Sequence, residues 1–380
     1  MLNIYQCIVC FVIGFIISTL FTPIAAKIAV KVGAVDVPTD PRKVHKKPIP
    51  RLGGIAIFFG VVISFILTNA VFGTHFLLDG VSLIQAAGIL CGATIIVIVG
   101  AVDDTKNIRA SVKLVFQILA AVIVIYSGTR IQIITNPFSE VGVTSLSPYI
   151  SIPLTVFWIV GVTNAINLID GLDGLAAGIC SIASISLLFI SISHAQPFVS
   201  IAASAIAGAT LGFLPYNFNP AKIFMGDTGA TFLGFVLAAI SIQGTFKAYT
   251  TVAIAVPFLV LGLPIFDTLF AIIRRMINGK SIMQADRGHI HHRLLDMGLS
   301  QKQSVVIMYT ISSVLGLMAI TLTGSTAVRI GVAVIALLVF IAAIIRHFIS
   351  ECIKNNNNNH GSVPKVQMDD DSLSNKAGNE

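Results

Sequence analysis

Charged residues are scarce in this sequence: they make up 11% of its 380 residues, whereas a soluble globular domain carries about 25%. Hydrophobic residues account for 55% of the chain, and the mean hydropathy is +0.91. This composition excludes an ordinary soluble domain. It predicts a polytopic membrane protein, in which each span needs about 20 apolar residues.

Cysteine pairs that could form a disulfide framework or a zinc site are also lacking. The sequence has 5 cysteines, nearly all inside apolar runs, and Cys7 and Cys10 form a C-x-x-C without a second pair. A zinc or redox role is therefore disfavoured. The excess of Lys and Arg gives a formal charge of +7. In a membrane protein this excess reports orientation, and no nucleic-acid partner is predicted.

The apolar residues fall into eleven runs, and the first lacks the basic residues of a cleaved signal, so we expect it to remain as a span. The runs cover about Ile4–Val30, Gly54–Phe72, Leu83–Val102, Leu114–Tyr126, Ile152–Val162, Leu175–Ile192, Phe198–Leu214, Gly229–Ile242, Thr251–Ile273, Ser304–Leu322 and Ala327–Ile349. Backbone polar groups must be paired inside lipid, so each span should be helical. We predict an all-α polytopic integral membrane protein with about 11 transmembrane helices. Residues 1–353 would form its single domain, and the Asn-rich residues 354–380 a disordered cytoplasmic tail.

Basic residues lie almost entirely in the odd-numbered connections between runs. These connections hold Lys31, Arg42, Lys43, Lys46, Lys47, Arg51, Lys106, Arg109, Lys113, Lys222, Arg274, Arg275, Lys280, Arg287, Arg293 and Lys302. The even-numbered connections hold Arg130, Lys247 and little else. By the positive-inside rule the odd connections are cytoplasmic, the N-terminus is outside and the C-terminus is inside.

The stretch Asn164–Gly174 is polar although it lies between two apolar runs. Asn164, Asn167, Asp170 and Asp173 recur at every third position, which places neighbours on one side of a helix or helical turn. A simple polar turn would explain the glycines and one Asn. It does not explain two carboxylates and two carboxamides in register, so we predict a functional site on the membrane face that carries the odd connections.

Three further carboxylates belong to the same face. Asp103 and Asp104 end the third run, and their side chains should project about 100° apart and have separate tasks. Asp227 precedes the eighth run and could be a helix N-cap, just as Asp103 and Asp104 could be a solvated pair. Carboxylates held close together take up protons unless a cation lies between them. Oxygen ligands without Cys or His suit Mg²⁺, or alternatively Mn²⁺.

The ninth connection places His289, His291 and His292 between Arg287 and Arg293. Arginines would oppose a metal cation but suit an anion such as diphosphate, so phosphate binding is favoured over zinc. A solvated basic loop remains the alternative.

Two more cations join this group. Arg51, ahead of a Gly-Gly pair, is either a topology signal or a phosphate ligand. Lys113 can extend toward the face that carries Asp104.

Carboxylates, amides and cations at one membrane face are typical of phosphoryl transfer, and the membrane setting implies a lipid substrate. A transporter would instead have polar groups near the mid-plane and broken helices in paired halves. Only Asp267, inside the ninth run, fits that alternative.

Five motifs resemble those of the polyprenyl-phosphate N-acetylhexosamine-1-phosphate transferase superfamily (MraY/WecA/TagO-like), in the family order and over about Val32 to Gly298. They are Pro50–Gly54, Val102–Asp104, Asn164–Leu175, Phe224–Gly229 and Gly288–Arg293. The resemblance implies that a polyprenyl-phosphate oxygen attacks the β-phosphorus of a UDP-sugar and that UMP is released. A one-step displacement is favoured over a covalent aspartyl intermediate, because a phosphate monoester is a competent nucleophile.

The resemblance also implies roles for the residues of these motifs. Asp227 would bind Mg²⁺ with Asn167 beside it, and Asp103 or Asp104 would accept a proton or place the metal. Asp170 and Asp173 would hold the nucleotide end, with Asn217 supporting that pocket. The remaining substrate-binding residues would be Lys113, Asn164, Arg51, Arg287, His289, His291 and His292.

The histidine motif bears on the substrate. In the branch that transfers MurNAc-pentapeptide, the motif resembles three consecutive histidines. In this sequence Ile290 interrupts the histidines. This sequence resembles the branch that transfers GlcNAc-1-phosphate from UDP-GlcNAc to undecaprenyl phosphate, the first membrane step of a teichoic acid or O-antigen-type polymer. We therefore expect a bacterial plasma-membrane enzyme with a cytoplasmic active site, surrounded by the lipid bilayer, with a homodimer left open. The alternatives are MurNAc-pentapeptide transfer and a non-catalytic binder or transporter of nucleotide-sugar or lipid-phosphate.

Overall fold

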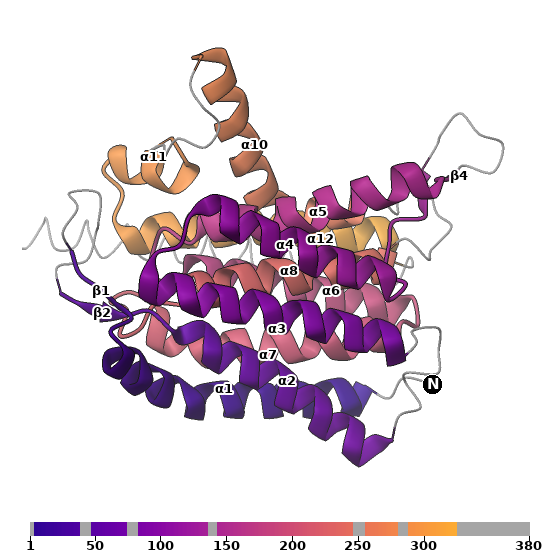
Figure 1. Cartoon of the computed structure of the whole chain (residues 1–380), viewed down its shortest axis with the longest axis horizontal. Helices are drawn as coiled ribbons and strands as arrows, with labels where there is room; N and C mark the ends of the chain where they lie inside the picture. Colours follow the sequence, from indigo (N-terminus) through magenta and orange to yellow (C-terminus); the bar gives the residue numbers. More distant parts are fainter. Residues whose placement is uncertain are drawn as a thin grey trace, which may run out of the picture. The chain divides into compact units, whose positions relative to one another are not determined.

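The computed structural model describes residues 4–38, 47–73, 83–135, 143–245, 255–279 and 288–324, which form mainly α-helices (Figure 1). The helices are α1 (Ile4–Val32), α2 (Gly53–Phe72), α3 (Leu83–Lys106), α4 (Ala110–Tyr126), α5 (Pro148–Ile169), α6 (Leu175–Ser193), α7 (Pro197–Asn217), α8 (Gly226–Thr245), α9 (Ala255–Val260), α10 (Gly262–Ile277), α11 (Ile290–Asp296) and α12 (Gln301–Thr323). Two antiparallel strand pairs accompany them: β1 (Val35–Asp36) with β2 (Ile49–Pro50), and β3 (Ile133–Thr135) with β4 (Val143–Ser145). The run Ala327–Ile349, the tail 354–380 and Arg287 lie outside the described residues.

Within the described ranges, seven helices are long and apolar enough to cross a membrane: α1, α2, α3, α5, α6, α7 and α12. The helix α4 is shorter but also apolar. The fifth apolar run was short in the sequence, and α5 reaches 22 residues by including the polar flank with Asn164 and Asn167. The all-α polytopic class is thus confirmed, whereas the number eleven stays a prediction.

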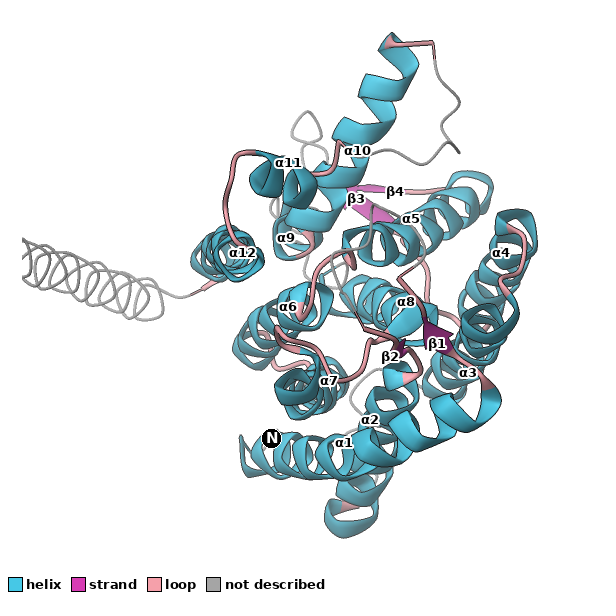
Figure 2. Cartoon of the chain, turned by 90° about the vertical axis from the view of Figure 1, so that its left-hand side faces the viewer, coloured by secondary structure: helices cyan, strands magenta, loops and turns pink. Residues whose placement is uncertain are grey.

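The helix α8 lies inside the bundle. Figure 2 views the bundle from the end that carries β1 and β2, and it shows α8 surrounded by α2, α3, α5, α6 and α7, all of which contact it. Every residue from Thr228 to Gln243 is buried, as expected of a helix that is apolar on all sides. The first turn of α8, with Asp227, therefore begins at the centre of one end of the bundle.

The ninth apolar run is not one helix. We expected a span over Thr251–Ile273, and the structure has α9 and α10 meeting at Leu261. Pro264 has no N–H to donate to the carbonyl of Val260, so a continuous helix would lose a hydrogen bond there. The helix α10 then leaves the other helices at an angle (Figures 1 and 2), and it ends close to the connection that carries the histidines.

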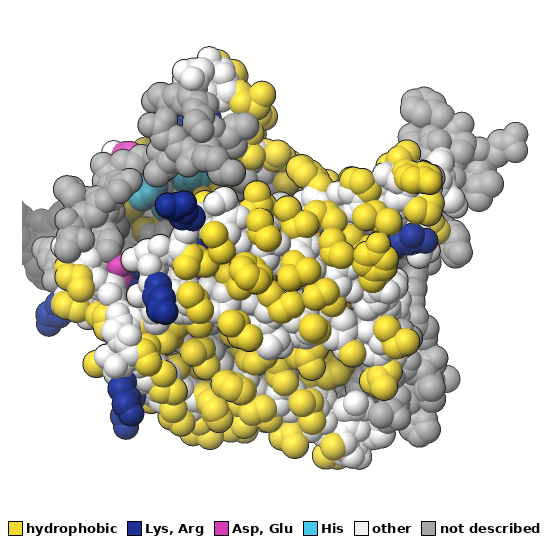
Figure 3. Space-filling model, in the orientation of Figure 1, with side chains coloured by type: hydrophobic (Ala, Val, Ile, Leu, Met, Phe, Trp, Pro, Cys, Tyr) yellow, Lys and Arg dark blue, Asp and Glu magenta, His cyan; other side chains and the backbone are white. Residues whose placement is uncertain are grey.

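Polar side chains gather at one end of the bundle. On the face drawn in Figure 3, hydrophobic side chains cover the middle, and the visible acidic and histidine side chains lie toward the left-hand end. That end holds the β1–β2 pair and α11 in Figure 1. The connections that follow α1, α3, α5, α7 and α10 thus meet at a common end, where the sequence predicted the site.

Candidate active site

The motif Pro50–Gly54 docks directly on the segment that precedes α8. Phe224 donates its N–H to the Pro50 carbonyl at 2.7 Å, and Gly53 and Gly54 donate to the carbonyls of Phe224 and Met225 at 3.0 and 2.9 Å. A Cβ at Gly54 would collide with the backbone of Gly229. Two motifs that are far apart in the sequence therefore form one backbone-paired unit, and the glycine is needed for the close approach of α2 and α8.

Asp104 caps α8 from a different helix. Its Oδ1 accepts the N–H of Asp227 at 3.0 Å, and its Oδ2 accepts the N–H of Thr228 at 3.0 Å and the Thr228 hydroxyl at 2.6 Å. Gly226 has φ +71°, and a Cβ there would overlap the Asp104 carboxylate. Free N–H groups at a helix start need such an acceptor. Because Asp104 provides it, the side chain of Asp227 is not the cap and is left for another purpose.

Arg51 neutralises the buried Asp104 carboxylate, whose side chain is 0% exposed. Its Nε and Nη2 lie 3.1 and 3.0 Å from Asp104 Oδ1, and the guanidinium is also within 4.0 Å of Asp36 and Asp227. A buried carboxylate without a partner would be strongly unfavourable. The structure thus engages Arg51 with carboxylates, and its binding of a substrate phosphate stays a prediction.

Lys113 joins the other two carboxylates. Its ammonium lies 2.9 Å from Asp103 Oδ2 and 2.7 Å from Asp227 Oδ2, and Asn167 Nδ2 donates to Asp227 Oδ2 at 3.2 Å. Asp103 also accepts the N–H of Ile108 at 2.8 Å. Asp103 and Asp104 therefore have different partners, and their separate tasks stay a prediction. We call Arg51, Asp103, Asp104, Lys113, Asn167 and Asp227 the carboxylate cluster.

The four polar residues of the Asn164–Gly174 stretch do not form one strip, so that prediction is wrong. The helix α5 ends at Ile169, because Asp170 leaves the helical conformation with φ −76° and ψ 54°. Asn164 exchanges hydrogen bonds with Gln117 and donates to the Val160 carbonyl at 2.8 Å. Asn167 reaches Asp227, and the two aspartates lie beyond the helix. The side chains of this stretch therefore do not share one helix face but contact several neighbouring elements.

Asp173 and Asn217 hold the α5–α6 connection to the α7–α8 connection. Asp173 Oδ2 accepts from Asn219 Nδ2 and from the N–H of Ala221, both at 3.0 Å. Asn217 accepts the N–H of Gly174 at 3.1 Å and donates to the Ile223 carbonyl at 3.0 Å. One oxygen of Asp173 is thus committed to the protein. Asn217 contacts this region through backbone groups alone, and its support of a nucleotide pocket stays a prediction.

Asp170 is the carboxylate with the strongest tendency to hold a proton. Burial, together with the negative charges of Asp227 and Asp104, raises the pKa of Asp170 to about 7 from 3.8. Burial is the larger cause of this shift, and the two neighbouring carboxylates add to it.

The raised pKa of Asp170 predicts a pH-dependent stability. In metal-free protein the folded state holds a proton on Asp170 between about pH 4 and pH 7 that the unfolded chain has released, so stability falls as pH rises through that window. The variant Asp170→Asn lacks this dependence. In detergent with EDTA, the melting temperature of Asp170→Asn minus that of wild type should increase from pH 5 to pH 8. The control is Asp296→Asn, an exposed acid of α11. An Asp170→Asn difference that is constant with pH would refute the assignment.

The histidine connection approaches Asp170 through Gly171. The ring of His291 contacts Gly171 so closely that a Cβ there would overlap it, and the rings of His289 and His291 stack 5.8 Å apart at an interplanar angle of 9°. Burial, with the neighbouring His292, lowers the pKa of His291 to about 4. His291 is therefore neutral near pH 7 and can offer a phosphate a hydrogen bond but no charge.

The carboxylate cluster fits a divalent cation bound together with substrate. Among the described residues no three His, Cys, Asp or Glu side chains form a metal site by themselves. Mg²⁺, however, typically takes one or two carboxylates and completes its shell with phosphates and water. Asp227 and the carboxamide oxygen of Asn167 are oxygen ligands of the type that Mg²⁺ requires. The amide of Asn167 can turn about its side-chain bond to present this oxygen.

Sequence reasoning missed several residues that the structure brings to this end. Gln117 pairs with Asn164, Thr228 with Asp104, and Asn219 with Asp173. Tyr309 on α12 donates to the Gly174 carbonyl at 2.5 Å. Gln117 had a usable signal, because it is a polar residue four positions after Lys113 in an apolar run. The others are ordinary loop or helix residues whose role depends on what lies opposite.

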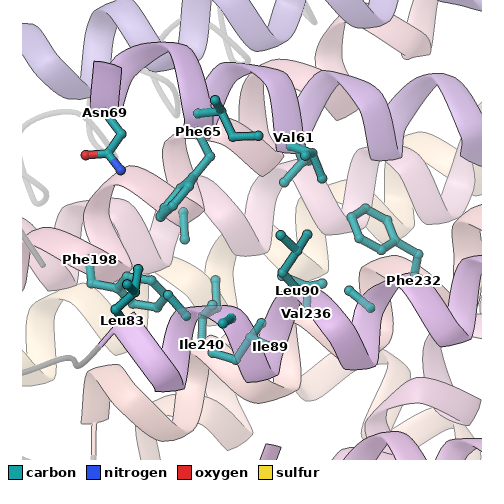
Figure 4. A pocket seen from close by; sticks show the side chains of 16 residues that line it. Val61, Phe65, Asn69, Leu83, Ile89, Leu90, Phe198, Phe232, Val236 and Ile240 are labelled. Atoms are coloured by element: carbon teal, nitrogen blue, oxygen red, sulfur yellow. The ribbon is translucent and has the colours of Figure 1, made fainter. Parts of the chain in front are cut away.

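An apolar pocket between α2, α3, α7 and α8 is separate from these residues (Figure 4). Phe65, Leu90, Phe198 and Phe232 contribute to its walls, and Asn69 is the one polar residue among those that line it. Such a lining offers no charge to bind phosphate groups. The pocket is therefore not the candidate active site.

Comparisons with known proteins show what the chain is similar to. The family description "Glycosyl transferase family 4" matches residues 86–245. A "Probable undecaprenyl-phosphate N-acetylglucosaminyl 1-phosphate transferase" of Bacillus subtilis (strain 168) is 41% identical over 323 residues, covering 84% of this chain and 86% of the relative. A "Decaprenyl-phosphate N-acetylglucosaminephosphotransferase" of Mycolicibacterium smegmatis is 34% identical, covering 82% of each. An "Undecaprenyl-phosphate alpha-N-acetylglucosaminyl 1-phosphate transferase" of Yersinia pestis is 28% identical, covering 80% and 81%.

Proposed function

The chain belongs to the superfamily of polyprenyl-phosphate N-acetylhexosamine-1-phosphate transferases, and from this premise we propose that it transfers GlcNAc-1-phosphate from UDP-GlcNAc to undecaprenyl phosphate. The products are undecaprenyl-diphosphate-GlcNAc and UMP. The observation that carries the proposal is the meeting of Asp103, Lys113 and Asp227 from α3, α4 and α8 at one end of a membrane bundle. Carboxylates and a cation in this arrangement suit phosphoryl transfer between a nucleotide-sugar and a lipid phosphate.

The site end of the bundle would face the cytoplasm of a bacterial cell, with the N-terminus outside. Support comes from the basic residues: Arg51, Lys106, Arg109, Lys113 and Lys222 lie in or beside connections that meet at this end, and such residues favour the cytoplasmic side. UDP-sugars are soluble, charged donors, which also suits a site open to the cytoplasm. The product would start a cell-envelope polysaccharide of the teichoic acid or O-antigen type.

In the reaction, an oxygen of the acceptor phosphate forms a bond to the β-phosphorus of UDP-GlcNAc. The bond between that phosphorus and the bridging oxygen breaks, and UMP leaves with the bridging oxygen. Asp103 takes the proton of the acceptor phosphate if it carries one. Lys113 lies between Asp103 and Asp227, where its ammonium can turn from these carboxylates to the substrate phosphates as they arrive.

Asp227 and Asn167 would hold Mg²⁺, with Mn²⁺ as the alternative ion. The metal would supply charge neutralisation to the diphosphate and make the β-phosphorus more electrophilic. Asp104 does not meet substrate in this scheme, whereas Arg51 would still be available to a substrate phosphate. Both residues fix the first turn of α8 and thereby the position of Asp227.

The donor would be held by the α5–α6 connection and the histidine connection. Asp170 lies beside the cluster, Asp173 anchors the connection, and His289, His291 and His292 would provide hydrogen bonds to the diphosphate and sugar. Ile290 separates His289 from His291 and His292 and starts α11. This spacing is the residue-level support for GlcNAc over MurNAc-pentapeptide as the transferred group.

The test is UMP release by purified protein in detergent with undecaprenyl phosphate. The donors are UDP-GlcNAc and UDP-MurNAc-pentapeptide, each with Mg²⁺ and with EDTA. We expect UMP from UDP-GlcNAc alone and a return to background with EDTA. UMP from the pentapeptide donor would keep the chemistry and overturn the donor assignment. Nucleotide binding without UMP from either donor would favour a non-catalytic binder.

A further inference from the structure

The helix α10 grips three consecutive residues of the histidine connection. Arg274 Nη1 donates to the Gly288 carbonyl at 2.8 Å. Asp267, about two turns earlier on the same helix, contacts the next two residues: its Oδ2 lies 2.8 Å from His289 Nδ1, and its Oδ1 accepts the N–H of Ile290 at 2.8 Å. The proposed reaction gives Asp267 no role, yet both of its oxygens are committed to this connection.

The contact between Asp267 and His289 determines how the imidazole is oriented. Asp267 is 3% exposed and His289 is 5% exposed, and a carboxylate so buried is kept ionised only by donors around it. An ionised carboxylate only accepts, so Nδ1 of His289 carries the hydrogen. The atom that remains for a ligand is Nε2, which has no hydrogen-bond partner among the described residues. The ring is therefore fixed in orientation and in which nitrogen it offers.

The neighbours of His289 place its ring close to the α5–α6 connection, which would hold the nucleotide-sugar. His289 stacks on His291, and His291 contacts Gly171, between Asp170 and Asp173. The helix α11 begins directly after His289, and its first N–H groups include that of Ile290, which Asp267 accepts. Asp267 thus fixes both the imidazole and the start of the short helix that carries the other histidines.

We propose that Asp267 is a positioning residue for nucleotide-sugar recognition: it holds His289 so that Nε2 faces the diphosphate of UDP-GlcNAc, to which the imidazolium form, with a hydrogen on each nitrogen, donates. The inference rests on the proposed function, and it adds a residue of α10 to the site. Asp267 does not touch substrate. It acts through His289, in the way that a carboxylate orients the histidine ligand of a metal by binding its other nitrogen.

The variant Asp267→Asn tests the inference, because its amide oxygen can accept from His289 or Ile290 but not from both. We expect KM and the dissociation constant for UDP-GlcNAc to rise by about 10- to 100-fold, the range of one hydrogen bond to a charged group. The KM for undecaprenyl phosphate should change little. The matched control is Asp296→Asn, which removes an exposed carboxylate from the end of α11 and should behave as wild type.

A double-mutant cycle with His289→Gln separates positioning from a structural role. If Asp267 acts through His289, the double variant should bind UDP-GlcNAc no more weakly than the weaker single variant. Additive losses, or a loss in Asp267→Asn that follows lowered thermal stability and affects both substrates equally, would overturn the inference. Because the cycle is measured by UDP-GlcNAc binding, it reads out even if wild type releases no UMP, a result that would instead refute the proposed function.

Discussion

Replacing Asp227 with Asn should lower the rate of UMP formation by about 10³-fold or more, because charge stabilisation by a metal ion is worth several kcal/mol. Asp227 Oδ2 is the atom on which Lys113 and Asn167 converge. The amide retains the shape of the side chain but loses the negative charge that would hold the cation. The fold should persist, since the start of α8 is capped by Asp104 and not by Asp227.

The measurement is initial UMP release over a range of Mg²⁺ concentrations, with the melting temperature of each variant recorded alongside. Asp296→Asn serves as the control for loss of one carboxylate. A second variant, Asn167→Ala, should lower UMP release at a given Mg²⁺ concentration less than Asp227→Asn does. It removes a neutral metal ligand, whereas Asp227→Asn removes a charged one. Wild-type activity of Asp227→Asn at ordinary Mg²⁺ would falsify the metal assignment.

The adjacent residues Asp103 and Asp104 should give different phenotypes when each is changed to Asn: the first should lose turnover and the second stability. Asp103→Asn should lower kcat by about 10²- to 10⁴-fold, the usual contribution of a general base, with UDP-GlcNAc binding within a few-fold of wild type. Its geometry permits this, since the amide oxygen can still accept the N–H of Ile108. The protein should fold normally.

Asp104→Asn should instead destabilise the protein. The carboxylate accepts from two backbone N–H groups and a hydroxyl and pairs with Arg51. The NH2 group of an amide cannot accept a hydrogen bond, so it would face at least one of these N–H or O–H groups. The amide also carries no negative charge to balance the Arg51 guanidinium. Breaking a buried pair from one side costs about 3–5 kcal/mol.

Melting temperature, kcat and the dissociation constant of UDP-GlcNAc are to be measured for both variants in parallel. A stable Asp104→Asn would show that the cap is dispensable. An Asp103→Asn variant with wild-type kcat would remove Asp103 as the base and leave the acceptor phosphate to react without one. Arg51→Met should reproduce the instability of Asp104→Asn, because it leaves the same carboxylate buried and unpaired.

These variants also distinguish residues that the sequence could not rank. Asp103 and Asp104 are equivalent in the sequence except for their order, and only their separation by about 100° predicted different tasks. Which one would face substrate depended on what lay opposite each of them. The structure places the start of α8 against Asp104 and Lys113 against Asp103.

The sequence by itself determined the class of the protein and the end of the bundle where the candidate site lies. Apolar runs long enough to cross a bilayer leave helices as the solution, because lipid offers no partner for backbone polar groups. The five motifs were sufficient to indicate the superfamily. Lys113 was expected to reach the face of the aspartates, and it does, although it lies on α4 and they lie on α3 and α8.

Only the tertiary structure decided the contacts between motifs. Helical spacing suggested one strip from Asn164 to Asp173, but the backbone turns at Asp170 and sends each side chain to a different neighbour. The break at Leu261, which brings Asp267 to His289, follows the same logic. Spacing along the chain describes the residues of one helix, whereas capping in trans, buried pairing and histidine orientation depend on residues from other helices. Those partners become known only when the helices are packed.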